Sequence, residues 1–157
     1  MEIEVRVYTK ELIQDVLDFE ARLRKEEDFW GWEIDEKYID EKYIDSVKKS
    51  FDDPAFDHSL SLLAYVDDKV VGRIDSSIIA SHFDGSKKAY LDWICVIKSY
   101  RHSGVAQRML SELIQRLKSQ NIETLIALTA SNDEAQRFYR SIPNSEMRDI
   151  GIWIDIQ

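Results

Sequence analysis

The residues with the clearest chemical meaning form one short run, Arg101-His102-Ser103-Gly104-Val105-Ala106. A glycine at the mouth of a helix lets a ligand approach the backbone closely, and the free N–H groups of the first turn attract an anion. Lys98 and Arg101 add positive charge. The run lacks the Gly-Lys-Ser/Thr ending of a Walker A loop and the three glycines of a dinucleotide fingerprint. We interpret it as a phosphate- or pyrophosphate-binding turn; the alternative is a plain strand-to-helix connection.

Two predicted elements position this run. Tyr90 to Ile97 is apolar and rich in strand-forming residues, which is typical of a buried strand. After Gly104 the apolar residues take helical spacing as far as Lys118, and they share one face: Val105, Ala106, Met109, Leu110, Leu113, Ile114 and Leu117. The sequence therefore predicts a strand, a basic loop and an amphipathic helix in succession.

A second pattern begins 28 residues after Gly104 and reads Asn132-Asp-Glu-Ala135-Gln-Arg-Phe138-Tyr139. With both patterns in this order, the chain resembles the GNAT superfamily of N-acetyltransferases over essentially its whole length. The resemblance implies an α/β (α+β) GNAT fold with a mixed sheet of six to seven strands and about four helices. It also implies one acetyltransferase domain over residues 1–157, which transfers the acetyl group of acetyl-CoA directly to an amine. One departure is Pro143-Asn144, where the family's second signature usually has Gly-Phe.

The resemblance also implies roles for individual residues. Asn132 would contact the pantetheine arm, and Tyr139 would protonate the leaving thiolate, since a phenol with a pKa of about 10 suits a thiol leaving group. The alternative for Tyr139 is a core aromatic beside Phe138. Backbone groups would hold the rest of the cofactor: Cys95, Val96 and Ile97 the pantetheine and acetyl carbonyl, and Arg101, His102, Ser103, Gly104, Val105 and Ala106 the pyrophosphate.

The general base is the least determined role. Asp92 lies in the strand that leads to the loop, and by simple alternation it shares a face with Tyr90. It is our candidate base, and the alternative is a charge exposed on the strand. Asp75, on the preceding predicted strand, is the reserve. Some members of the family have no protein base, so the absence of one would not contradict the resemblance.

A segment rich in carboxylates and tryptophan occupies residues 24–36. In the family this region forms one wall of the acceptor cleft. Tryptophan faces and carboxylates both attract ammonium groups. We therefore predict a cation-binding wall, to which Asp75 also contributes; the alternative is a solvated acidic loop whose tryptophans cover the core. The predicted wall residues in this segment are Glu26, Glu27, Asp28, Trp30 and Trp32.

Composition limits the possible partners. The net charge of −9 argues against a nucleic-acid binder and is compatible with a cationic acceptor. No apolar run approaches about 18 residues, and the first residues do not resemble a signal peptide, so we expect no membrane span and a cytoplasmic location. Cys95 is the only cysteine, and the three histidines have no ligand spacing, so we assign no metal.

The remaining pattern completes the predicted order β-α-α-β-β-β-α-β-α-β. Residues 60–66 and 70–80 predict a hairpin, residues 124–130 a further strand, and alternating isoleucines at residues 150–156 a closing strand. Residues 36–45 read Glu-Lys-Tyr-Ile-Asp twice and fit one helix. The ending, residues 147–156, resembles that of aminoglycoside 3-N-acetyltransferases.

These features favour an aminoglycoside or polyamine as the first acceptor class. Two alternatives remain open: a protein or peptide N-acetyltransferase, and a non-catalytic domain that binds CoA. The exposed closing strand also allows a homodimer.

Overall fold

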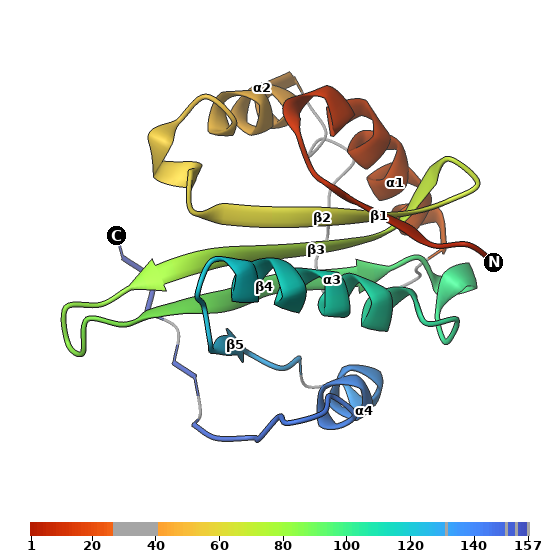
Figure 1. Ribbon diagram of the computed structural model, residues 1–157. Helices are drawn as coiled ribbons and strands as arrows, with labels where there is room; N and C mark the ends of the chain where they lie inside the picture. The colour runs from red at the N-terminus through yellow and green to blue at the C-terminus, as the bar shows by residue number, and fades with distance from the viewer. Residues whose placement is uncertain (27–40, 131, 150, 153, 157) are drawn as a thin grey trace. The chain divides into compact units, whose positions relative to one another are not determined.

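The computed structural model describes residues 1–26, 41–130, 132–149, 151–152 and 154–156 (Figure 1). By its internal contacts the chain divides into two compact units, Met1–Ile126 and Ala127–Gln157. The first carries the Arg101–Ala106 loop, and the second carries Asn132 and Tyr139.

The sheet has five strands, and their spatial order follows their order in the chain. The strands are β1 (Glu4–Val7), β2 (Ser59–Val66), β3 (Lys69–Ala80), β4 (Lys87–Val96) and β5 (Leu125–Ala127). β1 to β4 are antiparallel neighbours. The turn between β2 and β3 places Asp67 and Asp68 at φ 49° and 57°, the left-handed conformation that two-residue hairpin turns require. The predicted hairpin is therefore confirmed.

Helices cover both faces of this sheet. Within the first unit they are α1 (Ile13–Glu26), α2 (Glu41–Ser50) and α3 (Val105–Ser119), with short 3-10 turns at η1 (Lys10–Leu12), η3 (Pro54–Phe56) and η4 (Lys98–Tyr100). In Figure 1, α3 runs along the β3–β4 hairpin. The helix predicted after Gly104 is confirmed almost to the residue.

Consecutive residues of β3 show which helix covers which face. A side chain at Gly72 would place its Cβ 2.8 Å from Cε of Met109 on α3, so this glycine allows close packing of helix on sheet. Arg73, the next residue, contacts Glu20 of α1 instead. Since neighbouring residues of a strand point to opposite faces, α1 and α3 cover opposite sides of the sheet.

Two register shifts interrupt the regular alternation. Ala64 of β2 pairs with Gly72 of β3, whereas Tyr65 pairs with Val70. Val71 of β3 is therefore an extra residue, and it forms a bulge next to Gly72. In β4, Asp75 pairs with Trp93 while Ser76 pairs with Leu91, so Asp92 is the extra residue. A bulge re-aims side chains and often lies beside a functional site.

The second unit contains α4 (Asp133–Arg140). The closing strand predicted at residues 150–156 is wrong for the residues that can be described there, because 151–152 and 154–156 form no strand. Ile152, Ile154 and Ile156 are 83%, 75% and 96% exposed. Alternation favours a strand only where a neighbour supplies hydrogen bonds, and the sheet contains no strand from this segment.

The predicted α/β architecture is confirmed. β4, α3 and β5 form a strand–helix–strand unit beside antiparallel strands. Among the described residues there are four α-helices, as expected, and five strands where six to seven were predicted. The strand predicted over residues 124–130 is shorter, and ends at Ala127. The second Glu-Lys-Tyr-Ile-Asp copy opens α2, whereas the first, residues 36–40, lies outside the described residues.

Candidate active site

The start of α3 has the geometry of an anion site. Gly104 occupies the N-cap position at φ 88° and ψ 1°, a left-handed conformation that glycine adopts without strain. Among the described residues no side chain caps this helix, and its first turn carries no acidic residue. The first backbone N–H groups of a helix have no partner within the helix, and the helix dipole is positive there. An anionic group of a ligand would therefore be stabilised at this end of α3.

The turn before Gly104 is tightly folded. His102 also has a positive φ, 58°, and is exposed. The Ser103 hydroxyl donates to the Tyr100 carbonyl at 2.5 Å, and the Arg101 N–H donates to the Lys98 carbonyl at 3.2 Å. Non-glycine residues at positive φ are uncommon and gather at functional turns. The loop is thus held in one shape by its own hydrogen bonds.

Arg101 reaches back to the strand. Its Nε donates to the carbonyl of Val96 at 3.1 Å, and the guanidinium is partly buried. Sequence reasoning assigned Arg101 to the phosphate through its backbone and its charge. The structure adds a second task for the side chain, because this hydrogen bond fastens the loop to the last residue of β4.

Among the described strands, β5 flanks β4 over only part of its length. β4 has ten residues and β5 has three, so β5 can flank only part of it. Ala89 near the start of β4 donates to the Thr124 carbonyl at 2.8 Å. At the other end of β4, the Ile97 N–H donates to the carbonyl of Val71 on β3. The backbone groups of consecutive residues point to opposite edges of a strand, so those of Val96 face away from β3. That edge is where an extended ligand could pair with β4.

The side chains at this end of β4 belong to the core. Cys95, Val96 and Ile97 are 4%, 8% and 0% exposed. Cys95 and Ile97 join the core beneath α1, so Cys95 is a small core residue. Any contact of these three residues with a ligand must therefore use the backbone.

Asp92 lies at the bulge of β4 and is exposed. Simple alternation does not apply there, and it is Trp93 that pairs with Asp75 of β3. Trp93 is half-buried and packs against the core beneath α1. The carboxylate of Asp92 is accessible to solvent and to a ligand beside the middle of β4.

A group of charged and hydrogen-bonding side chains gathers on the α1 face of β3, and we call it the Arg73 cluster: Arg73, Asp75, Glu20 and Tyr43. Arg73 grips both oxygens of Asp75, with Nε to Oδ2 at 2.7 Å and Nη2 to Oδ1 at 3.0 Å. Its Nη1 donates to Glu20 Oε1 at 3.3 Å, and the hydroxyl of Tyr43 donates to the same oxygen at 2.9 Å. The cluster links α1, α2 and β3, and its two carboxylates exceed its one cation.

Burial perturbs the groups around the cluster. Desolvation raises the pKa of Glu20, although Tyr43 and Arg73 partly oppose this effect. The pKa of Arg73 is raised despite its burial, because Asp75 and Glu20 stabilise the guanidinium. Desolvation raises the pKa of Tyr8 to about 12, and its ring lies 5.2 Å from the Arg73 guanidinium carbon. These side chains, unlike Asp92, are largely withdrawn from solvent.

Sequence reasoning found Asp75 but missed its partners. Two features of the sequence indicate these partners. Arg73 is a charged residue inside an apolar strand and lies two positions from Asp75, which places both on one face. Glu20 lies four residues after the buried Val16 and therefore on the core-facing side of α1.

The second unit explains the spacing of the second pattern. Asn132 is the N-cap of α4, and its Oδ1 accepts from the Ala135 N–H at 2.8 Å. Three residues is the usual separation of a capping pair. Tyr139 is half-buried, and its ring meets that of Phe138 edge-on with the centroids 5.4 Å apart. The approach of Asn132 and Tyr139 to a cofactor stays a prediction.

The predicted acceptor wall is only partly visible. Glu27, Asp28, Trp30 and Trp32 lie outside the described residues. Glu26 ends α1, and both of its carboxylate oxygens contact Ser99 of η4. Asp75 is held by Arg73, as described above.

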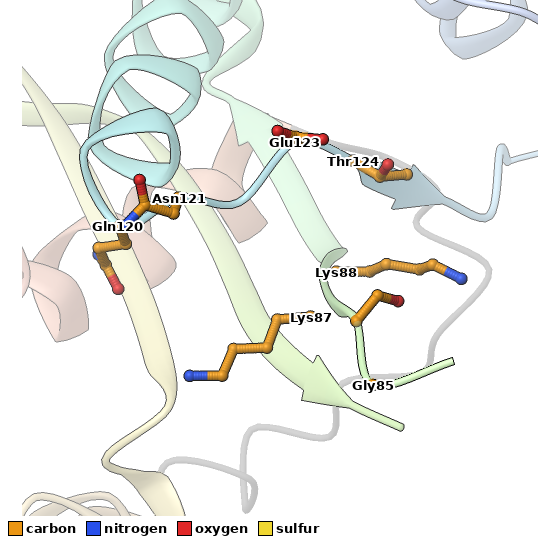
Figure 2. Close-up of a pocket in the computed structure, with 8 residues that line it drawn as sticks. Gly85, Lys87, Lys88, Gln120, Asn121, Glu123 and Thr124 are labelled. Carbon is orange, nitrogen blue, oxygen red and sulfur yellow. The ribbon is translucent and has the colours of Figure 1, made fainter. Parts of the chain in front are cut away.

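A cavity in the described part of the chain lies elsewhere. It has a volume of about 460 Å³ and is lined by the β3–β4 loop, the start of β4 and the residues after α3, including Lys87, Lys88 and Gln120. Figure 2 shows the two lysine side chains pointing to different sides. The Arg101–Ala106 loop lies at the other end of α3, a helix of 15 residues or about 22 Å. This cavity is therefore separate from the candidate site.

Comparisons with known proteins identify the family and the fold. Residues 13–142 match the model of the acetyltransferase (GNAT) family. No curated protein matches the sequence. Solved structures share the fold at low sequence identity. An aminoglycoside acetyltransferase from an uncultured soil metagenomic sample, in complex with trehalose, has a TM-score of 0.77 and 14% identity, over 99% of this chain and 97% of that one.

Two further solved structures are similar along their whole length. AAC(6')-Iy in complex with the bisubstrate analogue CoA-S-monomethyl-acetylneamine has a TM-score of 0.75 and 17% identity. Ribosomal-protein-alanine N-acetyltransferase from Brucella melitensis biovar Abortus 2308 has a TM-score of 0.74 and 13% identity. Both alignments cover 100% of each chain. At these identities the structures establish the fold, not the acceptor.

The family match covers most of the chain and contains both sequence patterns. Within the described ranges, no helix has the length and apolarity needed to cross a membrane. The fold, the glycine-capped helix after β4 and the family match lead to one assignment: the chain belongs to the acetyltransferase (GNAT) family and is an N-acetyltransferase.

Proposed function

We propose that the protein transfers the acetyl group of acetyl-CoA to a primary amine of a small cationic acceptor, with aminoglycosides and polyamines as the first classes to test. The observation that carries the cofactor assignment is the N-terminus of α3. It is capped by Gly104, has no acidic residue in its first turn and follows directly from β4. Such an end suits the pyrophosphate of CoA.

The same residues account for cofactor binding. Backbone N–H groups from Arg101 to Ala106 would receive the pyrophosphate. Backbone groups at Cys95 to Ile97 would pair with the pantetheine, because the side chains there are buried. Asn132 uses Oδ1 for the helix cap, so its amide N–H₂ is the part that would donate to the pantetheine.

The reaction requires proton transfers at the amine and at the thiolate. The attacking ammonium would first lose one proton, either to a side chain or to water. The amine nitrogen would then bond to the thioester carbonyl carbon, and backbone N–H groups of β4 would stabilise the charge that the carbonyl oxygen gains. As the C–S bond breaks, Tyr139 would donate its proton to the departing thiolate. The nitrogen would lose its second proton as the amide forms, and this proton would restore the Tyr139 phenol directly or through solvent.

We favour Asp92 over Asp75 as the acceptor of that proton. Asp92 is exposed at the bulge of β4. Asp75 has both oxygens occupied by the guanidinium of Arg73. The oxygens of Asp75 are therefore already engaged with the buried cation, whereas the carboxylate of Asp92 is exposed.

Charge supports a cationic acceptor. The chain carries a net charge of −9, and the Arg73 cluster holds two carboxylates against one guanidinium on the α1 face of the sheet. A surplus of half-buried negative charge attracts an ammonium group. Glu27, Asp28, Trp30 and Trp32 would add carboxylates and aromatic faces to this wall, and Asp75 would contribute through the cluster.

A thiol-release assay with acetyl-CoA and a panel of aminoglycosides, polyamines and peptides tests the proposal. We expect turnover on a cationic small molecule and a large loss in Tyr139→Phe and Asp92→Asn. Asp45→Asn, an exposed change on α2, is the matched control. Wild-type protein that binds acetyl-CoA and turns over no amine would overturn the proposal in favour of a CoA-binding domain.

A second function has one observation in its favour, the similarity to a ribosomal-protein-alanine N-acetyltransferase. Turnover of peptide N-termini or lysines, with none on aminoglycosides or polyamines, would select it. A homodimer and a cytoplasmic location also remain predictions, which sedimentation and fractionation would test.

A further inference from the structure

One contact joins the cofactor side of the first unit to the end of α1. Glu26 is the last residue of α1, and Ser99 lies in the middle of η4, 73 positions later. The Ser99 backbone N–H donates to Glu26 Oε2 at 3.0 Å, and its hydroxyl donates to Oε1 at 3.2 Å. A single carboxylate therefore takes both donors of one residue.

Both ends of this contact are firmly attached. On the strand side, Ile97 is fully buried, and the Tyr100 N–H donates to its carbonyl at 2.9 Å, which closes η4 around Ser99. On the helix side, Leu23 buries the last part of α1 in the core. Hydrogen bonds to an ionised carboxylate are stronger than neutral ones. The two hydrogen bonds therefore join η4 to the end of α1.

The contact joins two segments that each lead into a proposed or predicted binding region. η4 leads directly into the Arg101–Ala106 loop, whose backbone is the proposed pyrophosphate site. Arg101 fastens the other side of the same turn to Val96. The end of α1 leads directly into residues 27–40, where the sequence predicts the acceptor wall. Glu26 and its contact with Ser99 thus connect the proposed pyrophosphate site with the start of the segment in which the acceptor wall is predicted.

We propose that Glu26 is a positioning residue that couples occupation of the Arg101–Ala106 loop to the end of α1. Sequence reasoning placed Glu26 in the acceptor wall as a cation ligand; its contacts with Ser99 give it a different task. When a ligand restrains the loop, η4 is restrained with it, and the Glu26–Ser99 contact passes this restraint to α1. Coupling between sites is reciprocal, so a ligand that orders the end of α1 also tightens the loop. The inference rests on the proposed binding of acetyl-CoA.

Hydrogen exchange of the intact chain with and without acetyl-CoA tests the coupling. In the wild type we expect acetyl-CoA to slow exchange in the loop and, by at least about threefold, in the last turn of α1. In Glu26→Ala the loop should stay protected while the effect at α1 disappears. Ser99→Ala retains the backbone donor and loses the hydroxyl, so it should keep part of the effect. Asp45→Asn, which removes an exposed charge elsewhere, should behave as the wild type.

The outcomes separate this inference from the proposed function. Protection of the loop without protection of α1 in the wild type, or equal protection of α1 in Glu26→Ala, overturns the coupling alone. No protection of the loop in the wild type overturns the acetyl-CoA site and the coupling with it. Glu26→Gln keeps one acceptor oxygen for Ser99, so if Glu26→Ala does not fold, Glu26→Gln should keep only part of the effect at α1, and full protection of α1 there overturns the coupling.

Discussion

Substitution of Gly104 by alanine is the sharpest test of the anion site. Gly104 has φ 88°, and a Cβ placed there would meet nothing within 4 Å. The substitution therefore causes no steric clash in the chain itself. The substitution lowers the free energy of unfolding by roughly 1–2 kcal/mol, because an L-residue with a side chain is strained in the left-handed conformation.

The effect on binding is separate from the effect on stability. In a domain of this size a loss of 1 kcal/mol lowers Tm by about 2–4 °C, so we expect a decrease of about 2–8 °C. The added Cβ also stands where the backbone would meet a pyrophosphate. We therefore expect the Kd for acetyl-CoA, measured by calorimetry, to rise at least about tenfold, which corresponds to about 1.4 kcal/mol.

Gly85 provides the matched control. It lies in the loop between β3 and β4, has φ 68°, and would also place a Cβ in open space. Gly85→Ala should lower Tm by a similar amount and leave the Kd unchanged. An unchanged Kd in Gly104→Ala, or an equal rise in Gly85→Ala, would refute the assignment of the α3 N-terminus as the phosphate site.

Three further substitutions test the packing, the buried charge and the cap. Gly72→Ala would bring a Cβ to 2.8 Å from Met109 Cε, so we expect urea unfolding to show a loss of about 1–3 kcal/mol from overpacking. Burial of Glu20 raises the pKa of its carboxyl group above the ordinary value of 4.5. The protonated carboxyl therefore stabilises the folded protein in acid, and this stability is lost as pH rises through the folded-state pKa. Glu20→Gln should therefore gain Tm relative to the wild type as pH rises from about 4.5 towards 7. Asn132→Ala removes the hydrogen bond to Ala135 and should destabilise α4 by about 1 kcal/mol in hydrogen exchange, whereas Asn132→Asp should retain the cap.

Clear results would contradict each of these expectations. Unchanged urea unfolding in Gly72→Ala would mean that the flexible end of the Met109 side chain, or α3 itself, moves aside at no cost. A Tm difference between Glu20→Gln and the wild type that does not depend on pH would exclude the raised pKa. Equal exchange in Asn132→Ala and Asn132→Asp would remove the cap as the reason for the asparagine.

The structure departs from the sequence prediction where contacts between distant residues decide the outcome. Alternation alone placed Asp92 on the face of Tyr90, but the bulge in β4 interrupts that alternation, and a bulge depends on the register with β3. Asp75 was a plausible base until Arg73 and Glu20 were found beside it. The isoleucines after residue 150 have strand periodicity, yet their described positions form no strand.

Local chemistry was predictable because it depends on neighbours in the chain. The helix after Gly104 and the turn at residues 67–68 follow from apolar spacing and turn residues. The family assignment follows from two short patterns, of which one is a glycine N-cap and the other an asparagine N-cap. Cap positions require particular residue types, so the sequence records them directly.

The sequence by itself therefore determined the fold class, the family and the loop that would bind a phosphate. Only the tertiary structure decided which charges neutralise one another and which segments are joined, as in the Arg73 cluster and the contact between Glu26 and Ser99. Glu20 and Arg73 are 53 positions apart in the sequence, and Glu26 and Ser99 are 73 positions apart. No periodicity links such positions, because they meet only after hydrophobic packing has brought α1 against the sheet.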